Sequence, residues 1–259
     1  MNNRVVVITG ASSGIGEALA KQLAARGDSL VLAARGADKL QAVAEACGSR
    51  AKTIVTDVTK RSDMERLRDG AIAAFGHVDV WVNNAGRGIN RKVLELTDAD
   101  LDEMVLANTK SALYGMQAIV PYFMSRRAGH LINVSTVLSR VSAATFRSAY
   151  SAAKAALNVL TANLRVDLQN DYPAIRVSLV LPGGVPTAFQ KSSLGGTPEY
   201  NPPLKGARAQ TADEVAAVIA GVIDTPRAET YSSPVLRDLA QQYHADADAF
   251  ERATTTTSS

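Results

Sequence analysis

The chain has few of the residues that form disulfides or metal sites. Its 259 residues include a single cysteine, Cys47, and three histidines, which lie far apart at His77, His130 and His244. One thiol cannot form an internal disulfide, and no cluster of His and Cys has the spacing of metal ligands. We therefore expect no metal centre and no need for an oxidising compartment.

Long apolar runs and a large excess of one charge are also lacking. The first apolar run, in MNNRVVVITG, ends at a glycine after a few residues, far short of a signal-peptide core or a membrane span. Lys and Arg total 28 against 25 Asp and Glu, an excess too small to suggest a surface that binds nucleic acid. The composition therefore predicts a cytoplasmic protein that binds neither membrane nor nucleic acid.

Apolar residues make up 46% of the chain, which is enough for one substantial core. Short runs rich in Val, Ile and Leu recur without polar alternation, a pattern typical of strands buried on both faces of a parallel sheet. These runs lie at 4–8, 29–33, 52–56, 78–82, 130–134 and 175–181.

The segments between these runs have helical spacing, and several carry signals for a helix end or start. Gly27 follows the first helical stretch at a position where glycine commonly ends a helix. Thr97 with Asp100, and Thr211 with Glu214, form the S/T-x-x-D/E pattern of a helix start. Helices that alternate with buried strands indicate βαβ units, so we predict a single-domain α/β fold with a doubly wound parallel sheet.

The domain is predicted to cover residues 1–252 without an internal boundary. Within it, residues 188–210 are dense in Gly, Pro and Ser, and so long a loop in a compact domain is more often a lid or binding segment than a passive connection. The chain ends in TTTTSS, which has nothing to bury, so a disordered tail is expected at 253–259.

A glycine-rich turn, TGASSGIG at 9–16, directly follows the first apolar run. Gly10 permits a tight turn, Gly14 lets backbone N–H groups approach a pyrophosphate, and Gly16 allows close packing of helix on strand. The spacing G-x-x-x-G-x-G differs from the common G-x-G-x-x-G fingerprint, and such a turn could be a simple connection. Its place between a buried strand and a helix favours a dinucleotide site.

Further motifs follow this turn in a fixed order. They are Asn83-Asn84-Ala85-Gly86, Asn108, Tyr150-x-x-x-Lys154 and Pro182-Gly183-x-x-x-Thr187. In order and spacing, residues 1 to about 190 resemble the short-chain dehydrogenase/reductase family. The resemblance implies a Rossmann-like sheet of about seven strands, a bound NAD(H) or NADP(H), and a proton-transfer group of Tyr, Lys, Ser and Asn. The cofactor contacts it implies are Gly10, Ser12, Ser13, Gly14, Ile15, Gly16, Arg35, Asp57, Val58, Asn84, Ala85, Gly86, Tyr150, Lys154, Pro182, Gly183, Val185 and Thr187.

The end of the second apolar run bears on the choice of cofactor. In such sites an acidic residue binds the ribose hydroxyls of NAD, whereas arginine accommodates the 2′-phosphate of NADP. Here Ala34 offers no carboxylate, and Arg35 follows with a planar fork suited to phosphate. We therefore expect NADP(H) to be preferred, with NAD(H) as the alternative. The competing interpretation is that Arg35 only ends an exposed strand.

Tyr150 and Lys154 form the expected chemical centre. A phenol with an ordinary pKa near 10 must be made more acidic to take a proton from an alcohol. Residues four apart share a helix face, so the Lys154 ammonium could favour the phenolate and also reach a ribose hydroxyl. Such a pair is often plain helix surface; the resemblance favours the catalytic interpretation.

The third catalytic hydroxyl departs from the family pattern. The resemblance places a substrate-orienting serine at position 136, which is Thr136 here, preceded by Ser135. Thr136 is one residue further from Tyr150 than is usual in the family, and the usual spacing would select Val137, which cannot donate a hydrogen bond. Assuming a one-residue insertion, we assign the role to Thr136, with Ser135 as the alternative. Threonine keeps the hydroxyl but has a stiffer χ1.

Asn108 matches the asparagine that, in the family, holds a water linking the lysine to solvent. The alternative is a structural role as a buried polar bridge, since asparagine is mildly unfavourable inside a helix. Candidate walls of the substrate pocket are Arg87 to Asn90, Leu138 to Val141, Phe189 and the 188–210 segment, because ligands of such sheets bind beyond the carboxyl ends of the strands.

The expected function is reversible hydride transfer between NADP(H) and a carbonyl compound or secondary alcohol, with Tyr150 as the acid and base. A catalytically weak regulator or scaffold, suggested by Thr136, and a nucleotide-binding protein without redox chemistry are the alternatives. The stretch after Tyr150 is apolar or small on most sides, so the resemblance implies a homodimer or homotetramer. Its larger apolar residues are Leu157, Val159, Leu160, Leu164 and Val166.

Overall fold

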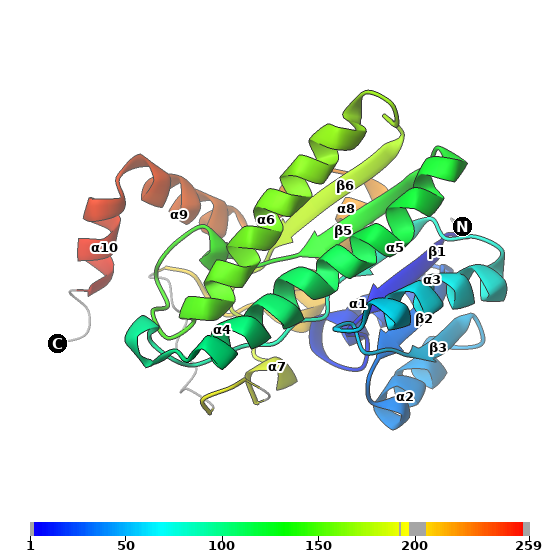
Figure 1. Cartoon of the computed structure of the whole chain (residues 1–259), viewed down its shortest axis with the longest axis horizontal. Coiled ribbons are helices and arrows are strands. Elements are labelled where there is room, and N and C mark those ends of the chain that lie inside the picture. The colour runs from blue at the N-terminus through cyan, green and yellow to red at the C-terminus, as the bar shows by residue number, and fades with distance from the viewer. Residues whose placement is uncertain (1–2, 192, 197–205, 256–259) are drawn as a thin grey trace.

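In the computed structural model, which describes residues 3–191, 193–196 and 206–255, seven strands form one sheet (Figure 1). The order is β3-β2-β1-β4-β5-β6-β7, and every neighbouring pair is parallel. The strand order reverses between β1 and β4, the topological switch point where ligands of such sheets bind. The strands are β1 (Val5–Thr9), β2 (Ser29–Ala34), β3 (Ala51–Val55), β4 (Val80–Asn83), β5 (Gly129–Val134), β6 (Ile175–Leu181) and β7 (Glu229–Tyr231).

Helices cover both faces of the sheet (Figure 1). Side chains of α1, α2 and α8 pack in one apolar cluster against the strands, and those of α3, α5 and α6 pack in another. The helices are α1 (Gly14–Ala25), α2 (Ala37–Cys47), α3 (Arg61–Phe75), α4 (Asp98–Val105), α5 (Ser111–Arg126), α6 (Ser148–Gln169), α7 (Ala188–Lys191), α8 (Ala212–Asp224), α9 (Pro234–Ala245) and α10 (Ala247–Thr255). Shorter elements are the 3₁₀ turns η1 (Val93–Glu95) and η3 (Val137–Ser139) and the π-helical η2 (Leu106–Lys110).

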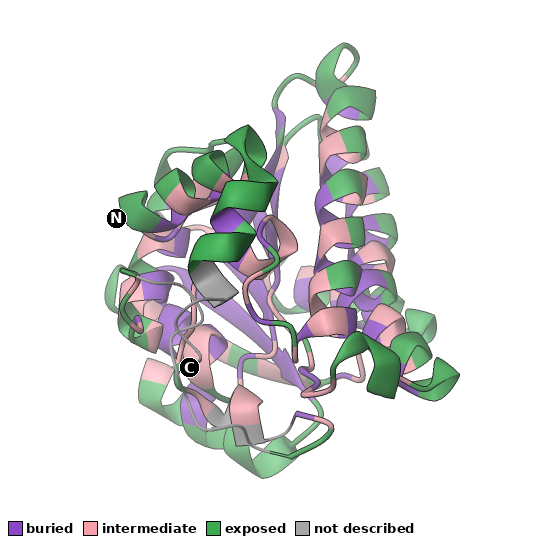
Figure 2. Cartoon of the chain, turned by 90° about the vertical axis from the view of Figure 1, so that its left-hand side faces the viewer, coloured by how far each residue is buried: buried purple, intermediate pink, exposed green. Residues whose placement is uncertain are grey.

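The continuous apolar runs are explained by this two-sided burial. In β1, Val6 and Ile8 belong to the cluster with α1 and α8, whereas Val5 and Val7 belong to the cluster with α3 and α5. Because successive side chains of a strand point to opposite faces, a strand covered on both faces needs apolar residues at every position. Figure 2 shows the result, with buried residues in the sheet and exposed residues on the outer sides of the helices.

The sheet confirms the predicted doubly wound α/β fold, and β1 to β6 overlap the six apolar runs, with bounds that differ by at most two residues. The seventh strand has no such run: β7 is the short sequence ETY, with Glu229 exposed and the other two residues partly buried. It is an edge strand that pairs with β6 alone among the described strands. The resemblance to the family implied this strand, and no residue pattern did.

The predicted helix signals act as expected. Thr97 Oγ1 accepts a hydrogen bond from the N–H of Asp100 (3.2 Å), and Thr211 Oγ1 accepts one from the N–H of Glu214 (3.1 Å). Gly27 adopts φ +88° just beyond α1, a conformation that glycine reaches without a Cβ clash.

The predicted lid at 188–210 is described in part. It begins with α7, and Leu194 forms an isolated bridge with Ile89, while residues 192 and 197–205 lie outside the described residues. At the chain end, α10 continues to Thr255, so the start of the tail predicted at 253–259 is helical and residues 256–259 are not described.

Candidate active site

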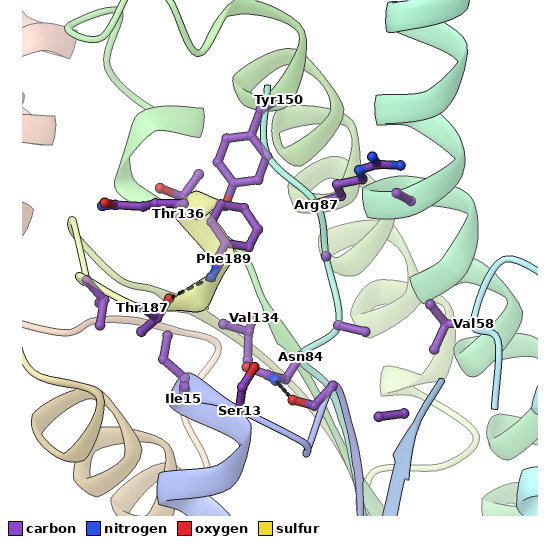
Figure 3. Close-up of a pocket in the computed structure, with 18 of the residues that line it drawn as sticks. Ser13, Ile15, Val58, Asn84, Arg87, Val134, Thr136, Tyr150, Thr187 and Phe189 are labelled. Carbon is purple, nitrogen blue, oxygen red and sulfur yellow. Dashed lines mark hydrogen bonds between the residues drawn. The ribbon is translucent and has the colours of Figure 1, made fainter. Parts of the chain in front are cut away.

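A cavity of about 720 Å³ lies at the carboxyl ends of the central strands (Figure 3). It brings together every predicted catalytic and cofactor-binding residue except Gly16 and Asn108. The predicted residues of these two kinds that line it are Gly10, Ser12, Ser13, Gly14, Ile15, Arg35, Asp57, Val58, Asn84, Ala85, Gly86, Thr136, Tyr150, Lys154, Pro182, Gly183, Val185 and Thr187. Of the candidate walls of the substrate pocket, Arg87, Leu138 and Phe189 line the cavity, whereas Gly88, Ile89, Asn90, Ser139, Arg140 and Val141 do not. Residues far apart in the chain therefore share one site at the switch point of the sheet.

The glycine-rich turn has the form that a dinucleotide phosphate requires. Gly10 and Gly14 have φ of +68° and +58°, values that other residues rarely adopt. A Cβ on Gly16 would collide with the carbonyl oxygen of Gly10, so Gly16 packs the start of α1 against the turn behind the cavity. Ser13 precedes α1 and makes no side-chain cap bond to it. The turn and the helix N-terminus thus fit a pyrophosphate.

The end of β4 is tied to this turn by hydrogen bonds. Asn84 Nδ2 donates to the carbonyl oxygen of Thr9 (2.9 Å), and Thr9 Oγ1 accepts from the backbone N–H groups of Asn84 (3.0 Å) and Ala85 (3.2 Å). The neighbouring Asn83 is buried, and its Nδ2 donates to Asn133 on β5 (2.9 Å). These amides fix the end of β4 against the turn and against β5, and Asn84 itself lines the cavity.

Two cations stand at the far end of the cavity, after β2. Arg35 and Lys39 are both exposed and both line it. Asp57, after β3, accepts hydrogen bonds from the N–H (3.1 Å) and Oγ1 (2.7 Å) of Thr59, which hold its carboxylate at the cavity wall. Lys39 was not predicted from the sequence. It lies in the first turn of α2 (Ala37–Cys47), and nothing in the sequence shows that this turn borders the cavity.

Tyr150 and Lys154 lie on the first turns of α6 at the other end of the cavity. Lys154 is buried, and its Nζ donates to the carbonyl oxygen of Val134 at 2.8 Å. Burial lowers the pKa of Lys154 to about 8. Burial also raises the pKa of Tyr150 to about 12, against the opposing effects of the Arg147 charge and of the Thr136 hydroxyl.

A second cation stands beside the phenol. Lys154 was expected to favour the phenolate, and that role stays a prediction; in addition, the charge of Arg147 lowers the pKa of Tyr150. Arg147 caps α6 three residues before Tyr150 and also lines the cavity. The sequence analysis did not identify Arg147, because nothing in the sequence shows that a single arginine between Phe146 and Ser148 is buried.

The three candidates for the catalytic hydroxyl are clearly separated. Thr136 Oγ1 accepts from the N–H of Leu138 (3.2 Å) and donates to the carbonyl oxygen of Pro182 (3.5 Å), and the hydroxyl lies near enough to the Tyr150 phenol to lower its pKa. Ser135 instead donates to Asn158 Oδ1 on α6 at 2.6 Å. Val137 is buried in an apolar cluster beneath α9. Figure 3 shows Thr136 and Phe189 both beside Tyr150.

Asn108 lies behind the cavity wall, in the π-helical η2, and is fully buried. Its Oδ1 accepts from the N–H of Arg87 (3.1 Å), and its Nδ2 donates to the carbonyl oxygens of Arg87 (2.9 Å) and Met104 (3.0 Å). A Cβ on Gly86 would lie 2.8 Å from Asn108 Oδ1 and 3.6 Å from Lys154 Nζ. The amide of Asn108 therefore bridges backbone groups beside the lysine, as the structural alternative predicts. The water relay stays a prediction.

Within the ranges that the structure describes, no group of three or more His, Cys, Asp and Glu side chains is arranged to hold a metal ion. Nor does any helix there have the length and apolar character to cross a membrane.

Comparisons with known proteins identify the family of the chain. The family model for short chain dehydrogenases matches residues 4–196. An uncharacterised oxidoreductase of Staphylococcus epidermidis is 35% identical over 193 residues, covering 74% of this chain and 83% of the relative. A short chain dehydrogenase/reductase from Burkholderia phymatum, solved with NAD, superposes with TM-score 0.85 at 26% identity and 95% coverage of both chains. An alcohol dehydrogenase from Thermococcus sibiricus, complexed with 5-hydroxy-NADP, gives TM-score 0.75 at 28% identity, covering 88% of this chain and 95% of that one. The chain therefore belongs to the short-chain dehydrogenase family.

Proposed function

We propose that this family member transfers hydride between NADP(H) and a carbonyl compound or secondary alcohol, with Tyr150 as the acid and base. The observation that carries the proposal is the shared cavity, in which a phosphate-binding turn stands at one wall and Tyr150, Thr136 and Lys154 at the other. A regulatory or scaffold role has no comparable support, because Thr136 keeps a hydroxyl in the cavity wall with Tyr150.

Each catalytic residue has a separate role in the proposed reaction. When bound, a reduced nicotinamide supplies the hydride. Tyr150 donates its phenolic proton to the carbonyl oxygen during reduction and takes it back during oxidation. Thr136 donates to the same substrate oxygen and orients it, while Lys154 holds a ribose hydroxyl. Asn108 is proposed to hold the water that resupplies the proton.

The remaining contacts hold the cofactor. We assign the pyrophosphate to the 10–16 turn, the adenine to Asp57 and Val58, and the nicotinamide carboxamide to Val185 and Thr187. Arg35 and the neighbouring Lys39 supply two positive charges where a 2′-phosphate would lie, which favours NADP(H) over NAD(H). The structural relatives include complexes with NAD and with an NADP derivative.

A screen of NADPH oxidation with ketones and aldehydes tests the proposed reaction. At least one carbonyl compound should be reduced by the wild-type protein, with NADPH consumed in equal amount. NADPH binding without oxidation of the cofactor by any carbonyl compound would instead support a regulator.

Thr136 should be the hydroxyl that matters for turnover. Thr136→Ala is expected to lower kcat by about 10²-fold, the usual effect of removing one donor to the developing oxyanion. Thr136→Ser should keep or raise kcat, because it retains both the donor and the bond from the Leu138 N–H. Ser135→Ala is the matched control and should have a smaller effect. If neither Thr136 variant changed kcat, the role would pass to Ser135.

We also propose a homodimer or homotetramer in which α6 is covered by a second copy. Val159 and Val166 are 60% and 66% exposed on this helix, while Leu157, Leu160 and Leu164 pack against the sheet. Apolar side chains on both sides of one helix favour a second covering layer. A monomeric mass in solution would contradict this assembly. A cytoplasmic location stays a prediction from the sequence.

A further inference from the structure

Arg147 is a buried cation that the proposed chemistry pairs with no group of the substrate or cofactor. It lines the same cavity as Tyr150 and precedes it by three residues, at the start of α6. Only 8% of Arg147 is exposed. Arginine is rarely buried so far unless an anion accompanies it, because removing a charge from water is costly.

The contacts of Arg147 leave its charge uncompensated. Its Nη1 donates to Ser193 Oγ (3.0 Å) and to the carbonyl oxygen of Ile89 (3.5 Å), both neutral acceptors. In the described part of the chain, no carboxylate forms an ion pair with it. By contrast, Arg87, which lines the same cavity, pairs with Glu103 at 2.7 Å.

Arg147 is packed between aromatic and backbone groups, close to the phenol of Tyr150. Its guanidinium carbon lies 6.0 Å from the centre of the Phe189 ring, and that ring lies 5.6 Å from the Tyr150 ring. Gly88 packs beside the guanidinium, where a Cβ would lie 2.5 Å from Nη1. A ligand group that enters here meets a cation, an aromatic ring and the phenol together.

We infer that the substrate carries a carboxylate that pairs with Arg147 while its carbonyl or hydroxyl carbon faces Tyr150, so that the enzyme acts on oxo acids and hydroxy acids. This inference rests on the proposed hydride transfer. A guanidinium presents two parallel N–H donors to a carboxylate, and such charge-assisted pairs fix orientation as well as affinity. In a low-dielectric pocket the pairing is stronger than in water.

The test compares oxo acids with their methyl esters, which have the same carbonyl but no charge. The probes carry the carbonyl at carbon 2, 3, 4 or 5 of a short chain. For at least one chain length, the wild-type protein should show kcat/KM about tenfold to hundredfold higher for the acid than for the ester. Arg147→Gln should remove this preference. Because the Arg147 charge also lowers the pKa of Tyr150, kcat/KM should fall for both probes, but about tenfold to hundredfold further for the acid than for the ester. Arg147→Lys should keep part of the preference.

Ser193→Ala separates charge recognition from a structural role. It removes the hydrogen bond to Arg147 and leaves the cation, so the acid-over-ester ratio should stay near the wild-type value. If Ser193→Ala removed the preference as fully as Arg147→Gln, Arg147 would be a support for the 193–196 segment and the inference would be wrong.

The outcomes distinguish this inference from the proposed function. Turnover of esters or simple ketones without any preference for acids would overturn the carboxylate site and leave the oxidoreductase intact. If no probe is reduced, calorimetry should measure the affinity of the NADPH-loaded protein for the oxo acids, which tests the carboxylate site without turnover. Binding that Arg147→Gln abolishes would support the carboxylate site and count against hydride transfer, whereas the absence of binding would overturn the site as well.

Discussion

Tyr150→Phe is expected to lower NADPH-dependent turnover by about 10³-fold or more, within or above the usual contribution of a general acid. The variant removes one hydroxyl and keeps the ring. The contact with Phe189, at 5.6 Å between ring centres, should therefore persist together with the shape of the cavity. NADPH affinity should stay close to that of the wild type, because the glycine-rich turn and Arg35 are untouched. Steady-state kinetics and a fluorescence titration with NADPH measure the two effects separately.

Tyr114→Phe is the matched control for this experiment. Tyr114 lies on α5, where the guanidinium of Arg61 sits 4.6 Å from its ring centre, and it does not line the cavity. Its variant should have wild-type turnover. Retained activity in Tyr150→Phe would refute the assignment of Tyr150 as the acid and base.

Arg35→Asp is expected to reverse the cofactor preference. Loss of charge-assisted bonds to the 2′-phosphate, together with repulsion from the new carboxylate, should weaken NADPH binding by about tenfold to hundredfold. The aspartate can instead accept hydrogen bonds from the ribose hydroxyls of NADH, whose binding should improve. Dissociation constants for both reduced cofactors follow from fluorescence titrations and need no substrate.

The control is Arg50→Asp, which makes the same change of charge outside the cavity. Arg50 is exposed, and its Nη1 donates to Asn3 Oδ1 at 3.3 Å. Its variant should leave the ratio of the two dissociation constants unchanged. An unchanged ratio in Arg35→Asp would mean that Arg35 only ends the second strand.

The fold was predictable where burial is complete. Strands β1, β2, β4, β5 and β6 are almost wholly buried and rich in Val, Ile and Leu, so the run is visible in the sequence. The edge strand β7 is partly exposed and three residues long. Its place in the sheet depends on pairing with β6, a tertiary contact without a local pattern.

The candidate site was predictable where it depends on local geometry. The glycines of the 10–16 turn and the Tyr150/Lys154 spacing report conformations that the chain adopts over a few residues. Lys39 and Arg147 escaped prediction because their importance comes from what other segments place beside them. Arg147 in particular is buried by Ile89 and Ser193, which lie far from it in the sequence.

The electrostatics of Tyr150 depend even more strongly on tertiary structure. From the sequence alone, Lys154 explains how the phenol becomes acidic. In the structure, burial dominates the pKa of Tyr150, and Arg147 supplies the main opposing charge. Burial also lowers the pKa of Lys154 to about 8, so its own positive charge is lost as the pH rises through that value. For alcohol oxidation the phenolate is the reactive form, and the rate should rise with pH through the pKa of Tyr150.

The most direct test of the account is an ultraviolet titration of Tyr150 in the NADP⁺ complex, taken as the difference between wild type and Tyr150→Phe. The account predicts ionisation below the ordinary tyrosine pKa of about 10, because Arg147, Lys154 and the oxidised nicotinamide together outweigh burial. Ionisation at about 12, the value that burial sets in the protein alone, would contradict proton transfer by this phenol.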